Sequence, residues 1–327
     1  MNWQGKKVLV TGAGGFIGSH LAEALVQKGA SVRAMVHYNA LGSWGWLDQS
    51  PQSQDMEITS GDIADSAWVD QALAGMEIVF HLASLIAIPY SYLAPASYVR
   101  TNVEGTLNLL QAARRHQAEL VVHTSTSEVY GTAVTVPIKE DHPLQGQSPY
   151  SASKIAADKM AEAFNLSFGL PVVTVRPFNT FGPRQSARAV IPTIITQCLA
   201  GEKLRLGNLH PTRDLNYVAN TVDGFLASAA EPQAVGRTIN LGSGREISIG
   251  DLARLIGGLL DRPLEIEQAP ERLRPDGSEV ERLLADNSLA RKLLGWEPKV
   301  VLEQGLKMTI TWIRQNQDKY RPGEYVL

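Results

Sequence analysis

Three things are scarce in this 327-residue sequence: cysteine, a surplus of one charge, and long apolar runs. The single cysteine, Cys198, excludes an internal disulfide and any cysteine-based structural metal site. With 30 basic and 33 acidic residues the net charge is -3, so we expect neither a nucleic-acid nor a membrane partner. No apolar run reaches the roughly 18 residues that a membrane-spanning helix needs. The apolar stretch after Lys6 and Lys7 is too short for a signal peptide, and we expect a cytoplasmic globular protein.

Short apolar, β-branched runs alternate with helical stretches through the first part of the chain. The predicted strands cover residues 7–11, 31–36, 56–60, 77–83, 120–125 and 172–176. The predicted helices cover residues 16–28, 66–74, 98–115 and 150–168, and Asp65 can cap the second of them. This alternation predicts an α/β fold built on a doubly wound parallel sheet, whose strand ends meet at one ligand-binding edge. We expect one domain over 1–179 and a smaller mixed α/β lobe over 180–327, with a strand returning to the main sheet near 237–241.

A glycine-rich turn joins the first predicted strand to the first predicted helix. Gly12, Gly15 and Gly18 permit a tight turn, close approach of the backbone to a pyrophosphate, and close helix packing. The helix N-terminus adds free N–H groups and a favourable dipole for phosphate. The strand–turn–helix context favours a dinucleotide site over an ordinary glycine-rich turn. The GxxGxxG spacing is the form used by short-chain dehydrogenase/reductases.

The second predicted strand ends without a residue that selects the cofactor. Residues 36–39 read Val-His-Tyr-Asn, with no carboxylate for a ribose hydroxyl and no arginine pair for a 2′-phosphate. We expect NAD and leave NADP open. Asp62, after the third strand, is either an adenine ligand or a turn residue.

A second motif carries chemistry. Tyr150 and Lys154 stand at i and i+4, on one face of a predicted helix. A phenol with a pKa near 10 is a poor base at neutral pH, but a nearby ammonium and an oxidised nicotinamide lower that pKa. Thr126, after the fifth strand, can donate a hydrogen bond to the same substrate oxygen. The alternative is a helix pair at the surface.

Glu128 is the residue that discriminates among reactions. It lies two positions after Thr126, at the predicted carboxyl edge of the sheet. An enzyme that only oxidises an alcohol needs no carboxylate there, whereas one that removes a proton next to a carbonyl does. The alternative is a solvated loop glutamate.

With these motifs in this order, the chain resembles the extended short-chain dehydrogenase/reductases, specifically the nucleotide-sugar 4,6-dehydratases. The resemblance covers nearly the whole length and includes residues 81–84, 102–106, 176–184 and 213–218. Thr126-Ser127-Glu128 looks like the active-site triplet of GDP-mannose dehydratase. Residues 84–91, 147–154 and 179–192 look most like dehydratases of UDP- or GDP-N-acetylglucosamine in legionaminic acid biosynthesis.

The resemblance implies a three-step reaction. Tyr150 takes the C4 hydroxyl proton while a hydride passes to the nicotinamide, and Glu128 then removes the C5 proton as water leaves C6. Return of the hydride to C6 gives a 4-keto-6-deoxy sugar. Glu128 also protonates the departing hydroxyl, and Ser127 assists only by hydrogen bonding.

The resemblance also implies the binding residues. The expected cofactor contacts are Gly12, Gly14, Gly15, Phe16, Ile17, Gly18, His37, Asp62, Ile63, Leu82, Ala83, Ser84, Asn102, Thr124, Tyr150 and Lys154. The expected substrate contacts are Pro89 and Tyr90 for the sugar, and Asn179, Arg188, Arg213 and Arg274 for the diphosphate. Arginine suits a diphosphate because its planar fork bonds two oxygens at once, although a surface salt bridge is the alternative for each. We expect no metal, and a homodimer formed through residues 98–115 and 150–168.

Three other functions remain open. A UDP-glucuronate decarboxylase shares the Thr-Ser-Glu-Val-Tyr-Gly stretch, although the Tyr-Ser-Ala-Ser-Lys segment disfavours it. A nucleotide-sugar 4-epimerase usually lacks an equivalent of Glu128. A non-catalytic cofactor-binding sensor or scaffold would not need Thr126, Tyr150 and Lys154 together.

Overall fold

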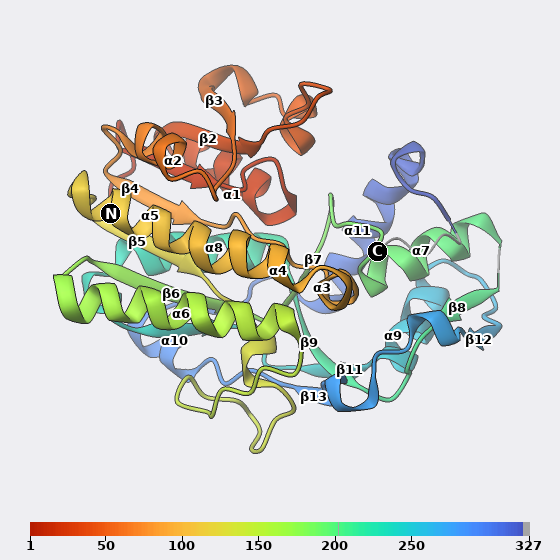
Figure 1. Cartoon of the computed structure of the whole chain (residues 1–327). Helices are drawn as coiled ribbons and strands as arrows, with labels where there is room; N and C mark the ends of the chain where they lie inside the picture. The colour runs from red at the N-terminus through yellow and green to blue at the C-terminus, as the bar shows by residue number, and fades with distance from the viewer. Residues whose placement is uncertain (202, 323–327) are drawn as a thin grey trace.

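A seven-stranded parallel sheet forms the centre of the computed structural model, which describes residues 1–201 and 203–322 (Figure 1). Its strands run in the order β10-β6-β5-β4-β1-β2-β3. They are β1 (Lys7–Thr11), β2 (Ser31–His37), β3 (Met56–Gly61), β4 (Ile78–His81), β5 (Leu120–Thr124), β6 (Val172–Pro177) and β10 (Thr238–Leu241). The predicted doubly wound α/β fold is confirmed.

Side chains alternate between the two faces of a sheet along each strand, and both faces of this parallel sheet are buried. From β1, Val8 and Val10 enter a core that contains residues of α1 (Phe16–Gln27) and α8 (Val218–Ala230). Leu9 enters the opposite core, with residues of α2 (Ser66–Leu73), α5 (Gly105–Arg115) and α6 (Pro149–Phe168). Helices on both faces leave only the strand ends open to a ligand.

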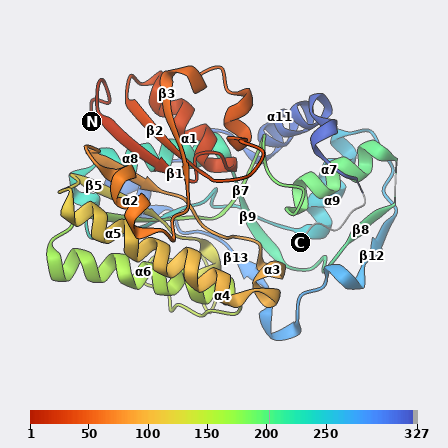
Figure 2. The same cartoon turned by 45° about the horizontal axis from the view of Figure 1, so that its top comes forward.

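Several elements of the second half of the chain lie to one side of this sheet (Figures 1 and 2). Strand β9 (Thr212–Tyr217) pairs with β7 (Asn179–Phe181), β11 (Glu246–Ser248) and β13 (Arg282–Leu283), and β8 (Leu204–Leu206) pairs with β12 (Ile266–Gln268). The helices there are α7 (Val190–Ala200), α9 (Ile249–Leu259) and α11 (Leu302–Gln315), whereas α10 (Ser288–Leu294) contacts β10 and α8 beside the main sheet. Strand β10 instead lies in the main sheet, parallel to β6.

Two elements differ from the sequence prediction. The helix expected over 98–115 is α4 (Pro95–Tyr98), a π-helical segment (Val99–Glu104) and then α5. Within the π segment, the buried Asn102 hydrogen-bonds to the loop after β4 and to α6. Strand β4 stops at His81 because Thr11 Oγ1 accepts the N–H groups of Leu82 and Ala83, which removes them from the strand ladder.

Helix α6 has 20 residues, which is long enough to cross a bilayer. It carries the charged residues Asp158, Lys159 and Glu162, so it is not apolar enough to do so. Every other helix in the described part of the chain is likewise too short or too polar to cross a membrane.

Candidate active site

The turn between β1 and α1 is shaped for a close ligand. Gly12 has φ +69°, and a Cβ there would lie 2.9 Å from the Ala83 nitrogen. A Cβ at Gly18 would lie 2.2 Å from the Gly12 carbonyl oxygen, so both positions require glycine. Helix α1 begins at Phe16 after Gly15, with no side-chain cap and no acidic residue in its first turn. Its N-terminus therefore suits the pyrophosphate of a dinucleotide.

The loop of residues 44–46, for which the sequence predicted no role, covers this turn. Trp46 donates its main-chain N–H to the Gly14 carbonyl at 3.0 Å. Gly14 lies so close to Trp44 that a Cβ would come within 2.6 Å of the Trp44 carbonyl oxygen. The Trp46 ring packs edge-on against Trp312 of α11, with centroids 5.3 Å apart. Residues 44–46 thus connect the glycine turn to the second half of the chain.

The loop after β4 is fixed from several sides. Asn102 accepts hydrogen bonds from Ser84 Oγ at 2.9 Å and Leu85 N at 2.8 Å. Its amide nitrogen donates to Ser153 Oγ of α6 at 2.9 Å. The predicted cofactor residues Leu82, Ala83 and Ser84 therefore lie on a backbone held by β1 and α6.

The three cofactor candidates beyond β2 and β3 have distinct surroundings. His37 is exposed at the end of β2. Asp62 accepts a hydrogen bond from the Ala64 N–H at 2.9 Å, as a turn residue does, and its contact with adenine stays a prediction. Ile63 is buried against Gly105, where a Cβ would come within 2.8 Å of its side chain.

Tyr150 and Lys154 meet the carboxyl end of β5. Tyr150 is 7% exposed and forms a hydrogen bond with Thr126. Burial raises the pKa of the Tyr150 phenol, the bond to Thr126 opposes this, and the charge of Glu128 adds to it. The groups of the protein thus raise this pKa, and its lowering by the ammonium and an oxidised nicotinamide together stays a prediction. Lys154 Nζ donates to the Thr124 carbonyl at 2.6 Å.

Burial also has the largest effect on the pKa of Lys154. It lowers the pKa of the Lys154 ammonium to about 8, against the opposing charge of Asp158. Both Tyr150 and Lys154 are therefore shifted toward their neutral forms, as expected for groups removed from water.

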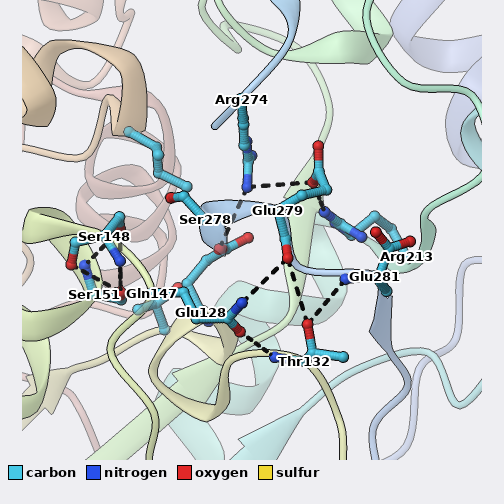
Figure 3. Close-up of polar contacts among 12 residues, drawn as sticks. Glu128, Thr132, Gln147, Ser148, Ser151, Arg213, Arg274, Ser278, Glu279 and Glu281 are labelled. Carbon is cyan, nitrogen blue, oxygen red and sulfur yellow. Dashed lines mark hydrogen bonds and ion pairs between the residues drawn. The ribbon is translucent and has the colours of Figure 1, made fainter. Parts of the chain in front are cut away.

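Glu128 is a buried residue, which excludes the solvated-loop interpretation. It lies in a short 3-10 turn, Ser127–Tyr130, capped by Thr126, whose Oγ1 accepts the Glu128 N–H at 3.3 Å. The residue is 8% exposed, and Arg274 Nη1 lies 3.7 Å from its Oε2 (Figure 3). The turn and Arg274 together direct this carboxylate into the interior.

Two predicted diphosphate arginines converge on a residue that the sequence analysis missed. Glu279 Oε1 lies 3.3 Å from Arg213 Nη2 and 3.8 Å from Arg274 Nη1. Burial lowers the pKa of Arg213, and the charges of Glu128 and Glu279 oppose that effect. Nothing in the spacing of Glu279 signals this position, because Arg213 is 66 residues away.

The segment from Arg274 to Glu281 is fastened to the loop that precedes α6 (Figure 3). Gln147 Nε2 donates to the carbonyls of Gly277 at 3.3 Å and Glu279 at 3.2 Å. Thr132 Oγ1 donates to the Glu279 carbonyl at 3.4 Å. Because Gln147 precedes Tyr150 by three residues, the arginine-bearing segment and the tyrosine helix are held together.

Other predicted residues border this region. Tyr90 and Pro89 lie on α3 (Ile88–Leu93), and the ring of Tyr90 is 6.2 Å from that of Tyr98, which is 6.2 Å from Tyr150. Arg188 is exposed, and its charge acts on Tyr98, whose pKa burial raises to about 12.

Three predicted site residues carry buried polar atoms without a hydrogen-bond partner in the described structure. They are Thr124 Oγ1, Asn179 Oδ1 and Arg274 Nη1. Buried polar atoms are rarely left unpaired, so these three atoms retain the capacity to form a further hydrogen bond. Within residues 1–201 and 203–322, no group of three or more His, Cys, Asp or Glu side chains is arranged to hold a metal ion.

Known proteins share this architecture over almost the whole chain. The family described as GDP-mannose 4,6 dehydratase matches residues 9–309. A UDP-glucose 4-epimerase of Mycolicibacterium smegmatis is 34% identical, covering 94% of this chain and 98% of its own. A UDP-glucuronic acid decarboxylase 1 of Xenopus tropicalis is 32% identical, covering 98% of this chain and 75% of its own.

A solved structure adds the third reaction. The dTDP-glucose 4,6-dehydratase DesIV of Streptomyces venezuelae, solved with NAD bound, superimposes with a TM-score of 0.88 at 28% identity. The match covers 95% of this chain and 98% of that one. The chain therefore belongs to the extended short-chain dehydrogenase/reductases, in the family of nucleotide-sugar dehydratases and epimerases.

Proposed function

We propose that the protein is an NAD-dependent nucleotide-sugar 4,6-dehydratase that acts on a nucleotide-linked N-acetylglucosamine. The observation that carries this proposal is the buried Glu128, next to the Tyr150–Thr126 pair. Oxidation at C4 alone uses only Tyr150, Thr126 and Lys154. A carboxylate beside them supplies the base for C5, whose proton becomes acidic once C4 is a ketone. The N-acetyl substituent follows from the resemblance of residues 84–91, 147–154 and 179–192 to dehydratases of such sugars.

The dinucleotide pocket fits NAD. The glycine turn and the uncapped N-terminus of α1 would hold the pyrophosphate, and Thr124 and Lys154 lie where β5 ends. A bound nicotinamide supplies the hydride acceptor and donor. NAD is favoured by the solved dehydratase that contains it, and no arginine pair follows β2 to hold a 2′-phosphate.

The substrate would bind across the convergent arginines. Arg213 and Arg274, with Asn179 and Arg188, would hold the diphosphate, and Pro89 and Tyr90 would line the sugar pocket. Arg213 is buried, and Arg274 carries a buried Nη1 without a hydrogen-bond partner, so both guanidinium groups suit phosphate oxygens. A doubly anionic ligand would also replace part of the negative charge that Glu128 and Glu279 now present to these arginines.

The proton transfers at C4 and those at C5 and C6 would be carried out by different residues. Tyr150 takes the C4 hydroxyl proton, with Thr126 donating a hydrogen bond to the same oxygen and Lys154 stabilising the phenolate. Glu128 takes the C5 proton and returns a proton to the departing C6 hydroxyl. Ser127 assists only by hydrogen bonding, so one carboxylate serves both sides of the elimination.

The proposal extends to the organisation of the chain. Residues 1–179 would bind the dinucleotide and carry the chemistry, and residues 180–327 would bind the nucleotide sugar. Helices α5 and α6 would form a homodimer interface, to which the exposed Leu166 and Phe168 of α6 can contribute. Light scattering over a concentration series tests this, and monomer at every concentration would exclude it.

Transfer of deuterium tests the reaction. With UDP- and GDP-N-acetylglucosamine deuterated at C4, the label is expected at C6 of the product, without net consumption of cofactor. In deuterated water, C5 is expected to gain solvent deuterium. Label kept at C4 of a C4-inverted sugar would indicate an epimerase, and carbon dioxide from UDP-glucuronate a decarboxylase. Tight binding of cofactor without turnover of any sugar would favour the sensor or scaffold.

A further inference from the structure

One buried carboxylate beneath the active site has no role in the proposed chemistry. Asp158 follows Lys154 by four residues, one turn further along α6, and is 4% exposed. His123 donates from Nε2 to its Oδ1 at 3.0 Å, since a carboxylate only accepts. Ser125 Oγ donates to its Oδ2 at 2.7 Å, and Arg176 Nη2 donates to the same oxygen at 3.0 Å.

These bonds surround the acceptor of Lys154. His123 and Ser125 are the two chain neighbours of Thr124, whose carbonyl accepts the bond from Lys154 Nζ. Asp158 therefore ties α6 to the strand end on both sides of that carbonyl. The next residue after Ser125 is Thr126, the partner of Tyr150.

The cluster of Asp158, His123, Arg176 and Lys154 contains few charged groups. Arg176 of β6 and Lys154 of α6 are both buried, and Asp158 is the anion that pairs with Arg176 at 3.0 Å and whose charge acts on Lys154. Burial favours a neutral His123 and lowers its pKa, so the histidine supplies a hydrogen bond and little charge. The ionisable groups around Lys154 and Asp158 are His81 of β4, His123 of β5, Arg176 of β6 and Tyr150 of α6.

We propose that Asp158 is a positioning residue for the reaction: it keeps Lys154 protonated and fixes it on the Thr124 carbonyl, so that Lys154 can stabilise the Tyr150 phenolate. The inference rests on the proposed roles of Tyr150 and Lys154. Asp158 itself contacts neither of the reacting groups in this arrangement. It acts through the charge and the position of Lys154.

The electrostatics agree with this geometry. Burial pulls the pKa of Lys154 down to about 8, and Asp158 is the group that opposes the fall. Burial alone would raise the pKa of Asp158, but the bonds and charges of His123, Arg176 and Lys154 lower it to about 2. These neighbours therefore favour the ionised form of Asp158.

The variant Asp158→Asn tests the proposal because it removes the charge and retains the shape. With [13Cε]lysine-labelled protein, and the Lys154 signal assigned by Lys154→Arg, the pKa of Lys154 is expected to fall by about one unit or more. The alkaline limb of the kcat/KM profile should move to lower pH by the same amount. Ser125→Ala is the matched control: it removes one hydrogen bond to the carboxylate but no charge, and should leave the Lys154 pKa in place.

A folded Asp158→Asn protein with an unchanged Lys154 pKa would overturn the proposal. If this variant does not fold, Asp158→Asn combined with Arg176→Gln removes the uncompensated guanidinium, and a smaller fall is expected because a neighbouring cation is lost with the anion. The NMR titration needs no substrate, which separates this inference from the proposed function. A fall in the Lys154 pKa without any movement of the pH profile would refute the positioning role, and full activity of Lys154→Ala would refute the proposed catalytic group itself.

Discussion

Arg274 Nη1 lies 3.7 Å from Oε2 of Glu128, although the two residues are 146 positions apart in the chain. The contact joins a proposed diphosphate ligand to the proposed base. It keeps a cation beside Glu128. One guanidinium thus lies next to the proposed base and belongs to the proposed diphosphate site.

Replacement of Glu128 by Gln should stop the reaction after the first oxidation. The amide keeps the shape but cannot accept the C5 proton, so turnover is expected to fall about 10²- to 10⁴-fold. Absorbance of reduced nicotinamide should then build up when sugar is added. Glu281→Gln is the control, since Glu281 is exposed on the same segment. Tyr150→Phe should prevent even that build-up, and full turnover by Glu128→Gln would remove this residue from its role.

Replacement of Arg213 by Gln should weaken nucleotide binding. A lost charge-assisted hydrogen bond costs about 1.5–3 kcal/mol, or roughly 10- to 150-fold in the dissociation constant. Calorimetric titration with UDP and with GDP measures the effect. Arg205→Gln is the control, because that arginine forms an exposed pair with Glu271. Equal affinities for the two variants would place the diphosphate elsewhere.

Replacement of Gly18 by Ala should reduce both folding stability and cofactor affinity. The new Cβ would meet the Gly12 carbonyl at 2.2 Å, and such overpacking costs about 1–3 kcal/mol. Gly258→Ala, in α9, is the matched control, because its Cβ would meet nothing within 4 Å. That substitution should stabilise the protein by about 0.4–1 kcal/mol. Urea unfolding and NAD titration measure the two effects, and unaltered NAD binding by Gly18→Ala would argue against this turn as the pyrophosphate site.

Acid should destabilise the fold through its buried histidines. Burial lowers the pKa of His81 well below the usual 6.5, and the charges of His123 and Lys154 add to this. Below pH 6.5 His81 binds a proton in the unfolded chain but not in the folded protein. The free energy of unfolding is therefore highest above that pH and decreases as pH falls. The slope is about 1.4 kcal/mol per pH unit for each such histidine.

Urea unfolding between pH 7 and pH 5 measures this slope. His81→Gln should reduce the slope by the contribution of one histidine, about 1.4 kcal/mol per pH unit. His210→Gln, at an exposed position, should leave it unchanged. An identical slope in both variants would contradict the assignment to His81.

Local features of the chain were predictable because they depend on neighbouring residues. Asp65 caps α2 by accepting the N–H groups of Ala67 and Trp68, as its place before a helical pattern predicts. The glycine turn follows equally from the spacing of Gly12 and Gly18. The end of β4 was misplaced, because Thr11, 71 residues away from Leu82, takes the main-chain groups that would extend it.

The sequence by itself determined the alternation of strands and helices, the dinucleotide turn, and the order of Thr126, Glu128 and Tyr150, since short-range periodicity and steric limits encode them. Only the tertiary structure decided which distant charges meet. Glu279 became part of the site through Arg213 and Arg274, and Asp158 through strands that bring Arg176 beside it. Burial then set the proton affinities of Tyr150 and Lys154, because desolvation depends on everything packed around a group and not on its neighbours in the chain.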